Sequence, residues 1–152
     1  MGIKDLVKLR SVDEIDAEFL YDMLKERDST VNVTHKKLPT FTEHLKFIKS
    51  SPYDAWYIIL ANTRKVGHIF IDSEDRIGWF ITKEYKGLGF VVPAFEELKK
   101  LQKREKYLGK INPKNYDAQN LIVKLKFILK ETYPDYLLYE YRNNDSIQSF
   151  KE

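Results

Sequence analysis

The stretch that decides the fold is IGWFITKEYKGLGFVVPAFEEL, residues 77–98. Its first six residues are rich in β-branched and aromatic side chains, which is typical of a strand. A loop with Gly87 and Gly89 follows, and a helix is predicted to start near Phe90, because Pro93 is tolerated in a first helical turn. The first N–H groups of a helix lack intrahelical partners, so this loop is either an anion site or only a turn.

Two further strands are predicted directly before this stretch, WYIILA (56–61) and VGHIFID (66–72). Turn-forming residues at 62–63 and 73–75 separate the three strands, which predicts that they pair antiparallel in chain order. Their apolar residues do not alternate with polar ones. A sheet built from them is therefore expected to carry helices on both faces.

The rest of the chain alternates between helical and strand patterns. Apolar residues at helical spacing predict helices over 15–24 and, after the capping pair Thr40 and Glu43, through Ile48. The other predicted elements are a strand at 7–10, the helix from 90 to 101, a strand at 107–111, a helix at 118–127 and strands at 128–132 and 136–141. The polar tail from Asn143 is expected to fray.

This order, β-α-α-β-β-β-α-β-α-β-β, predicts an α/β fold. The expected architecture is a mixed, mostly antiparallel sheet of about seven strands with helices on both faces. Because no repeat or linker interrupts the pattern, residues 1–152 are expected to form a single domain.

Composition excludes several classes of function. The chain has no cysteine, so disulfides, thiolate zinc sites and cysteine nucleophiles are absent, and no metal is expected. No apolar run could span a membrane and the N-terminus lacks a signal-peptide pattern, so we expect a soluble cytoplasmic protein with no membrane partner. A net charge of +3, from 26 basic and 23 acidic residues, is too weak to predict nucleic acid as a partner.

Three motifs resemble the GNAT family, the GCN5-related N-acetyltransferases. KGLGFV (86–91) is similar to the family's pyrophosphate loop, Arg/Gln-x-x-Gly-x-Gly/Ala, and follows a strand that looks like the family's fourth. INPKNYDAQNLIVKLKF (111–127) is similar to its later asparagine and helix. EHLKFI (43–48) resembles the branch that acts on amino sugars, nucleotide-linked sugars and protein N-termini.

The resemblance implies that acetyl-CoA is the cosubstrate, bound in a split between the strands at 77–82 and 107–111. Backbone groups of the first strand would pair with the pantetheine amides, loop amides would hold the pyrophosphate, and the later asparagine would contact the pantetheine arm. The residues implied are Phe80, Ile81, Thr82, Lys86, Gly87, Leu88, Gly89, Phe90, Val91 and Asn115.

The chain departs from the family pattern at four positions. Lys86 replaces Arg or Gln but still supplies a cation, whereas Val91 replaces a small residue and is expected to narrow the phosphate cradle. Ile122 stands where many members have a tyrosine that protonates the leaving thiolate. Lys126 replaces the glycine before Phe127.

A general base is not obvious, because Arg76 and Lys110 stand at two positions where relatives often have a carboxylate. Either the base lies elsewhere, or the site favours an anionic substrate such as a nucleotide-linked amino sugar, or the protein binds CoA without efficient catalysis. His68 is the remaining candidate, since the turn at 73–75 places it beside Phe80, near the expected acetyl group. Its alternative is a histidine satisfied within a packed sheet.

Four other side chains are candidates for the acceptor site. Tyr139 and Tyr141 alternate on the last strand and either line the acceptor cleft, replacing the missing acid, or pack against the sheet. By resemblance, Asn32 and His35 face the acceptor cleft as substrate-binding residues; otherwise they belong to a solvated loop.

The expected function is an N-acetyltransferase that uses acetyl-CoA on a primary amine of a small molecule, with an amino sugar or nucleotide-linked amino sugar ahead of a protein N-terminus. The alternative is a CoA-binding module of the same fold that has lost turnover. An exposed last strand could pair two subunits into a homodimer.

Overall fold

The computed structural model describes residues 6–27 and 37–143, which form a seven-stranded sheet in the order β1-β2-β3-β4-β5-β7-β6. The strands are β1 (Val7–Ser11), β2 (Ala55–Ala61), β3 (Arg64–Ile71), β4 (Arg76–Ile81), β5 (Lys106–Ile111), β6 (Ile128–Thr132) and β7 (Leu137–Arg142). The helices are α1 (Ala17–Glu26), α2 (Phe41–Lys49), α3 (Val91–Leu101) and α4 (Tyr116–Lys124), with short 3₁₀ helices η2 (Glu14–Asp16) and η3 (Lys83–Tyr85). The expected α/β fold is confirmed.

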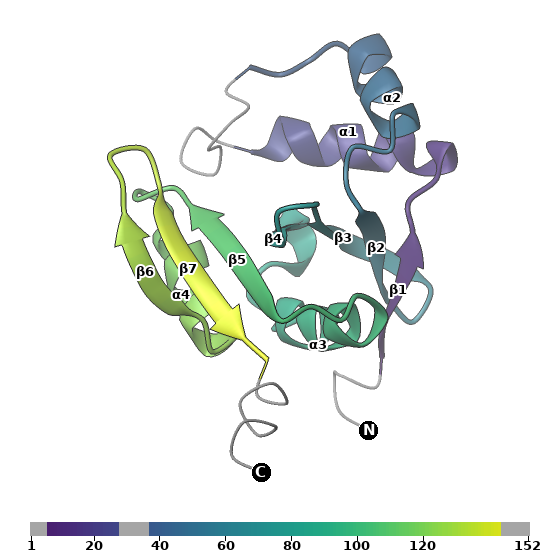
Figure 1. The fold of residues 1–152 in the computed structure, drawn as a ribbon. Coiled ribbons are helices and arrows are strands. Elements are labelled where there is room, and N and C mark those ends of the chain that lie inside the picture. Colours follow the sequence, from purple (N-terminus) through teal and green to yellow (C-terminus); the bar gives the residue numbers. More distant parts are fainter. Residues whose placement is uncertain (1–5, 28–36, 144–152) are drawn as a thin grey trace.

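Helices cover both faces of the sheet, as the uniformly apolar strands predicted. Phe95 of α3 and Ile122 of α4 are fully buried in the larger core on one face. On the other face, Met23 of α1 packs with Ile58 and Phe80 from the strands. Figure 1 shows α1 and α2 together on one side of β2–β4 and α3 on the opposite side. We refer to the side that holds Phe80 as the α1/α2 face.

Helix ends follow local chemistry. At the start of α2, Oγ1 of Thr40 accepts from the backbone N of Glu43 at 3.1 Å and the Glu43 carboxylate accepts from the backbone N of Thr40 at 2.9 Å. This confirms the predicted capping box. The prediction for α4 was too long at its C-terminus, because the helix ends at Lys124 and Lys126 turns the chain with a left-handed φ of 75°.

The strands β4 and β5 are paired only at one end. Every neighbouring pair in the sheet is antiparallel except this one, which is parallel and limited to Arg76 opposite Leu108 and Ile77 opposite Gly109. β4 nevertheless stays paired with β3 as far as Ile81. The two halves of the sheet therefore separate beyond Ile77, as Figure 1 shows for β5 running away from β4.

The sheet edge differs from expectation. The last strand, β7, lies between β5 and β6, so the prediction that the last strand is an exposed edge is wrong, whereas the homodimer stays a prediction. The two edge strands are β1 and β6, and the five residues of β6 are all exposed, including Ile128 with 69% of its surface accessible. Any pairing of sheets between subunits on this side would use β6.

Candidate functional site

The separation of β4 from β5 leaves backbone groups of β4 without a partner strand. The backbone N of Thr82 donates to the Val66 carbonyl at 2.9 Å, and in this register Phe80 lies opposite His68. Since backbone groups alternate sides along a strand, Phe80 and Thr82 bond to β3, while Trp79 and Ile81 face the split. The predicted backbone site is corrected accordingly: Ile81 is available, Phe80 and Thr82 are not, and Trp79 was missed.

The loop after β4 has the geometry of an anion cradle. Gly87 and Gly89 adopt left-handed φ values of 78° and 85°, and nothing lies within 4 Å of a Cβ built on either. α3 begins without a side-chain cap, and within the described residues the backbone amides from Leu88 to Val91 donate no hydrogen bond. Unpaired amides at a helix start, reached over glycines, suit a phosphate group.

Two side chains near the cradle correct and extend the prediction. Val91 is 3% exposed and packs in the larger core, so it does not narrow the cradle as expected. Lys86 extends instead to the α1/α2 face, with Nζ 4.9 Å from the centroid of the Phe80 ring. A cation therefore lies between the loop and the split.

Asn115 lies at the start of α4, four residues beyond the end of β5. Its side-chain oxygen accepts from the backbone N of Ala118 at 3.1 Å and so caps the helix. Its amide nitrogen and the second lone pair of that oxygen are left for the predicted contact with a pantetheine arm.

His68 lies opposite Phe80, as the turn predicted, but its lone pair is occupied. Nδ1 of His68 accepts a hydrogen bond from the indole Nε1 of Trp56 at 3.1 Å. Burial, followed by the charge of Arg27 and then His44, lowers the pKa of His68 to about 3. A neutral imidazole whose Nδ1 accepts carries its proton on Nε2, so it has no free lone pair with which to act as a base.

The other sequence candidates lie elsewhere. Tyr139 is buried in the larger core, and the hydroxyl of Tyr141 accepts from Nζ of Lys99 at 3.1 Å. Both tyrosines belong to the core beneath α3 and α4, opposite the α1/α2 face, so the prediction that they line the acceptor cleft is not met. Asn32 and His35 lie outside the described residues.

The departures from the family pattern have structural explanations. Ile122 is fully buried, and its Cδ1 occupies the space above Gly109, where an added Cβ would lie at 2.5 Å. Arg76 is neutralised within its turn by Asp72 at 2.8 Å and Glu74 at 3.3 Å. Arg76 therefore offers no free charge to a substrate, and Ile122 serves packing.

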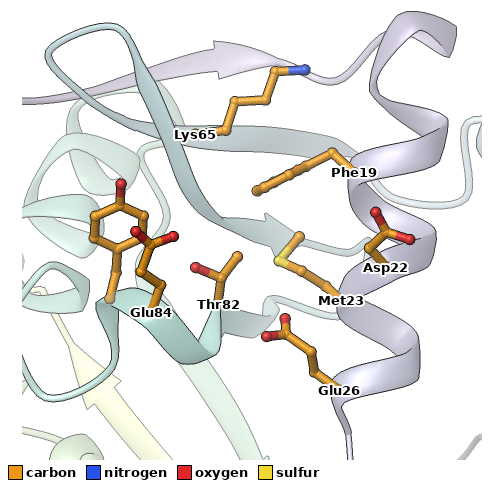
Figure 2. Close-up of a pocket in the computed structure, with 8 residues that line it drawn as sticks. Phe19, Asp22, Met23, Glu26, Lys65, Thr82 and Glu84 are labelled. Carbon is orange, nitrogen blue, oxygen red and sulfur yellow. The ribbon is translucent and has the colours of Figure 1, made fainter.

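A pocket of about 270 Å³ lies between α1 and η3, beside the end of β4. Figure 2 shows Phe19, Met23 and Glu26 projecting from α1 toward Thr82 and Glu84. The lining residues are Phe19, Asp22, Met23, Glu26, Lys65, Thr82, Glu84 and Tyr85. Three carboxylates suit an ammonium group, although Glu26 already accepts from the backbone N of Lys83 at 2.9 Å.

Sequence reasoning missed this pocket. Four of its residues recur at 19, 22, 23 and 26, the spacing of one helix face, which was the available signal. In residues 6–27 and 37–143 no group of His, Asp or Glu side chains could hold a metal ion. The described helices include none that is long and apolar enough to cross a membrane.

No protein-family model matches the sequence, and no curated protein matches it. Solved structures do match. The spermidine N-acetyltransferase from Vibrio cholerae, in complex with CoA and spermine, is 14% identical over 94% of this chain and 99% of that one, with a TM-score of 0.78. An acetyltransferase from Salmonella typhimurium that modifies the N-terminal serine of ribosomal protein L7/L12 is 14% identical over 93% and 98%, with a TM-score of 0.73.

The microcin C7 self-immunity acetyltransferase, in complex with acetyl-CoA and AMP, is 17% identical over 91% of this chain and 93% of that one, with a TM-score of 0.71. At such low identities the similarity shows the fold. The fold is that of the GNAT acetyltransferases, as the sequence motifs predicted.

Proposed function

We propose that the protein is an N-acetyltransferase that transfers the acetyl group of acetyl-CoA to the primary amine of a small molecule. The observation that carries the proposal is the continuity between the unpaired backbone of β4, at Trp79 and Ile81, and the cradle at Leu88–Val91. CoA combines an arm containing two amides with a diphosphate, and these groups match the two parts in chain order.

In this proposal Trp79 and Ile81 bond to the pantetheine amides, and the amides of Leu88–Val91 bind the diphosphate. Gly87 and Gly89 allow the close approach, and Lys86 supplies positive charge. The side-chain amide of Asn115 remains for the pantetheine arm. Similar folds solved with CoA or acetyl-CoA support this assignment. The proposal includes a cytoplasmic location, where acetyl-CoA is available.

The main contribution of the protein to this reaction would be to position the amine against the thioester. The amine lone pair attacks the thioester carbonyl, a C–N bond forms, the C–S bond breaks and CoA leaves as a thiolate. The ammonium proton passes to water or a carboxylate, and the thiolate takes a proton from solvent. The backbone N–H of Trp79, the first one left unpaired at the split, is the candidate donor to the oxyanion.

A CoA-binding module without efficient turnover is the second candidate. It is favoured by Ile122 in place of a tyrosine and by the occupied lone pair of His68. The site therefore lacks a tyrosine acid at position 122 and a histidine base at position 68, whereas the anion cradle is unaffected.

Calorimetric titration of acetyl-CoA tests the binding half of the proposal. Gly89→Asp would place a carboxylate in the cradle and should abolish binding. Gly89→Asn is the matched control, because asparagine has the same size and tolerates a left-handed φ but carries no charge. Loss with both variants would trace the effect to backbone strain. Absence of binding to the unmodified protein would reject the proposal.

Turnover is tested by following released CoA with a thiol reagent. The chain contains no cysteine, so the whole signal comes from CoA. The acceptors are spermidine, glucosamine, a nucleotide-linked amino sugar and a peptide with a free N-terminus. Release with a small amine supports the proposal, release with the peptide alone selects a protein N-terminal acetyltransferase, and binding without release selects the module.

A further inference from the structure

Arg27, which directly follows α1, is a partly buried cation with no anionic partner among residues 6–27 and 37–143. Its side chain is half-buried, and its Nε is buried without a hydrogen-bond partner. Within the described residues it forms no ion pair, and the neighbouring Glu26 is engaged by the backbone of Lys83. Charges removed from water are normally paired, because an uncompensated one costs several kcal/mol. An anion at this position would compensate the charge of Arg27 and accept from its Nε.

His44, on α2, presents a second unpaired nitrogen to the same region. The residue is 4% exposed, and its Nε2 is buried with no partner among the described side chains. Burial and then the charge of Arg27 lower the pKa of His44, which keeps its ring neutral. With its proton on Nε2, the neutral ring of His44 would offer an N–H donor alongside the Arg27 guanidinium, a pair of the kind that binds carboxylate or phosphate oxygens.

Other cations lie on the same face of the sheet as Phe80. The guanidinium carbon of Arg27 lies 5.3 Å from the centroid of the Phe80 ring, and Nζ of Lys86 lies 4.9 Å from it. Lys110 lies across the split, on β5, one residue beyond the last residue paired with β4; the register puts it on the α1/α2 face, and its Nζ lies 4.5 Å from the centroid of the Tyr136 ring. None of these three cations has an ion-pair partner among the described residues. Arg27 and Lys86 thus place positive charge at the Phe80 ring, beside the split.

We infer that Arg27 and Nε2 of His44 bind an anionic group, a carboxylate or a phosphate, carried by the acceptor amine. This inference rests on the proposed function. It assigns the protein an amine substrate with a negative charge, unlike the polycation spermine bound by the similar fold from Vibrio cholerae. A neighbouring cation also raises the fraction of amine in the unprotonated, attacking form.

The competing interpretation is that Arg27 only packs on Phe80. The melting temperature of the Arg27→Met variant distinguishes the two interpretations. If the arginine serves packing, Arg27→Met should lower the melting temperature, because the cation–π contact is lost without compensation. If it is kept for a ligand, the substitution removes an uncompensated charge and the melting temperature of the ligand-free protein should not fall.

Matched acceptor pairs test the assigned specificity. We would compare kcat/KM for O-phosphoethanolamine with ethanolamine, for β-alanine with β-alaninamide, and for spermidine. The anionic member should be favoured by about tenfold or more, and Arg27→Met should remove the preference. Lys25→Met is the control, because Lys25 is 55% exposed, pairs with Asp22, and should leave the preference intact. A preference for spermidine, or one unchanged by Arg27→Met, would overturn the inference.

Anion binding is also measured without turnover. The Nε–H resonance of Arg27, identified by its loss in Arg27→Met, is followed while phosphate, acetate, β-alanine and O-phosphoethanolamine are added. The amine-bearing anions should shift it saturably and more tightly than the free anions. A shift without acetyl transfer would support the anion site and reject the activity. Transfer without any shift would support the activity and reject the site, and equal binding of free anions would reject an acceptor subsite.

Discussion

The indole Nε1 of Trp56 donates to Nδ1 of His68 across 3.1 Å, between neighbouring strands β2 and β3. This bond fixes the imidazole tautomer with its proton on Nε2 and removes the lone pair that a general base needs. His68 is therefore predicted to be a packing histidine rather than the base of the proposed reaction.

Substitution of His68 tests that role directly. His68→Gln keeps an oxygen that accepts from Trp56, and kcat/KM for acetyl transfer should change by less than about tenfold. A general base contributes about a hundredfold or more. A loss of that size, with the fold intact by circular dichroism, would restore His68 as the catalytic base.

The same residue predicts how stability depends on pH. Because burial lowers the pKa of His68 from 6.5 to about 3, the unfolded chain binds a proton in this interval and the folded one does not. The contribution of His68 to the unfolding free energy is complete above pH 6.5. It is lost as the pH falls toward 3, by up to about 1.4 kcal/mol per pH unit. Denaturant unfolding at several pH values measures this slope.

His68→Gln is the matched variant for this measurement. Its unfolding free energy should fall less steeply with acidification than that of the unmodified protein, leaving the contribution of His44, whose pKa is lowered in the same direction. Identical slopes would show that His68 does not titrate as the buried environment requires.

A stabilising substitution is predicted at the end of α4. Lys126 has a φ of 75°, a conformation that costs a residue with a Cβ about 1 kcal/mol. Lys126→Gly should therefore raise the unfolding free energy by about 0.5–1 kcal/mol. Lys124→Gly, inside the helix, is the control and should lower it by about 1 kcal/mol. Equal losses in both variants would contradict the argument.

The sequence predicted the local features of the site and missed the ones that depend on distant segments. Gly87 and Gly89 signalled the cradle, because a left-handed loop before a helix is a local property. The backbone groups of Trp79 are unpaired because β5 separates from β4 before this residue. The point of separation cannot be read from the pattern of residues within each strand. Arg27 and Glu26 end an amphipathic helix and resemble ordinary solvated charges until the sheet is placed beneath them.

The face of the sheet on which a side chain lies was also predictable only where it depends on local features. Alternation within one hairpin placed His68 opposite Phe80, because the turn fixes the register. Tyr139 and Tyr141 alternate just as clearly, but which face of β7 they occupy depends on its insertion between β5 and β6. The sequence order of strands gave no signal for that insertion.

Among the residues near the pocket, Asp16 is predicted to be the one whose substitution destabilises the fold most. Its carboxylate is fully buried and accepts from Arg10 at 2.8 Å, from Lys65 at 2.7 Å and from the backbone N of Asp13 at 2.9 Å. Asp16→Asn leaves two cations unpaired and should cost about 3 kcal/mol. Asp22→Asn is the control: its side chain is 63% exposed, so the change should stay within about 0.5 kcal/mol.

The contact between Gly109 of β5 and Ile122 of α4 leads to a prediction about position 122, where many members of the family have a tyrosine. Gly109→Ala places a Cβ 2.5 Å from Cδ1 of Ile122 and should cost about 1–3 kcal/mol. Ile122→Val removes that methyl group and alone should cost about 0.5–1.5 kcal/mol. In the double variant the clash is gone, so the combined loss of unfolding free energy should be smaller than the sum of the two. Additive losses would mean that the helix does not sit on β5 at this point, and position 122 would then have room for the tyrosine that this chain lacks.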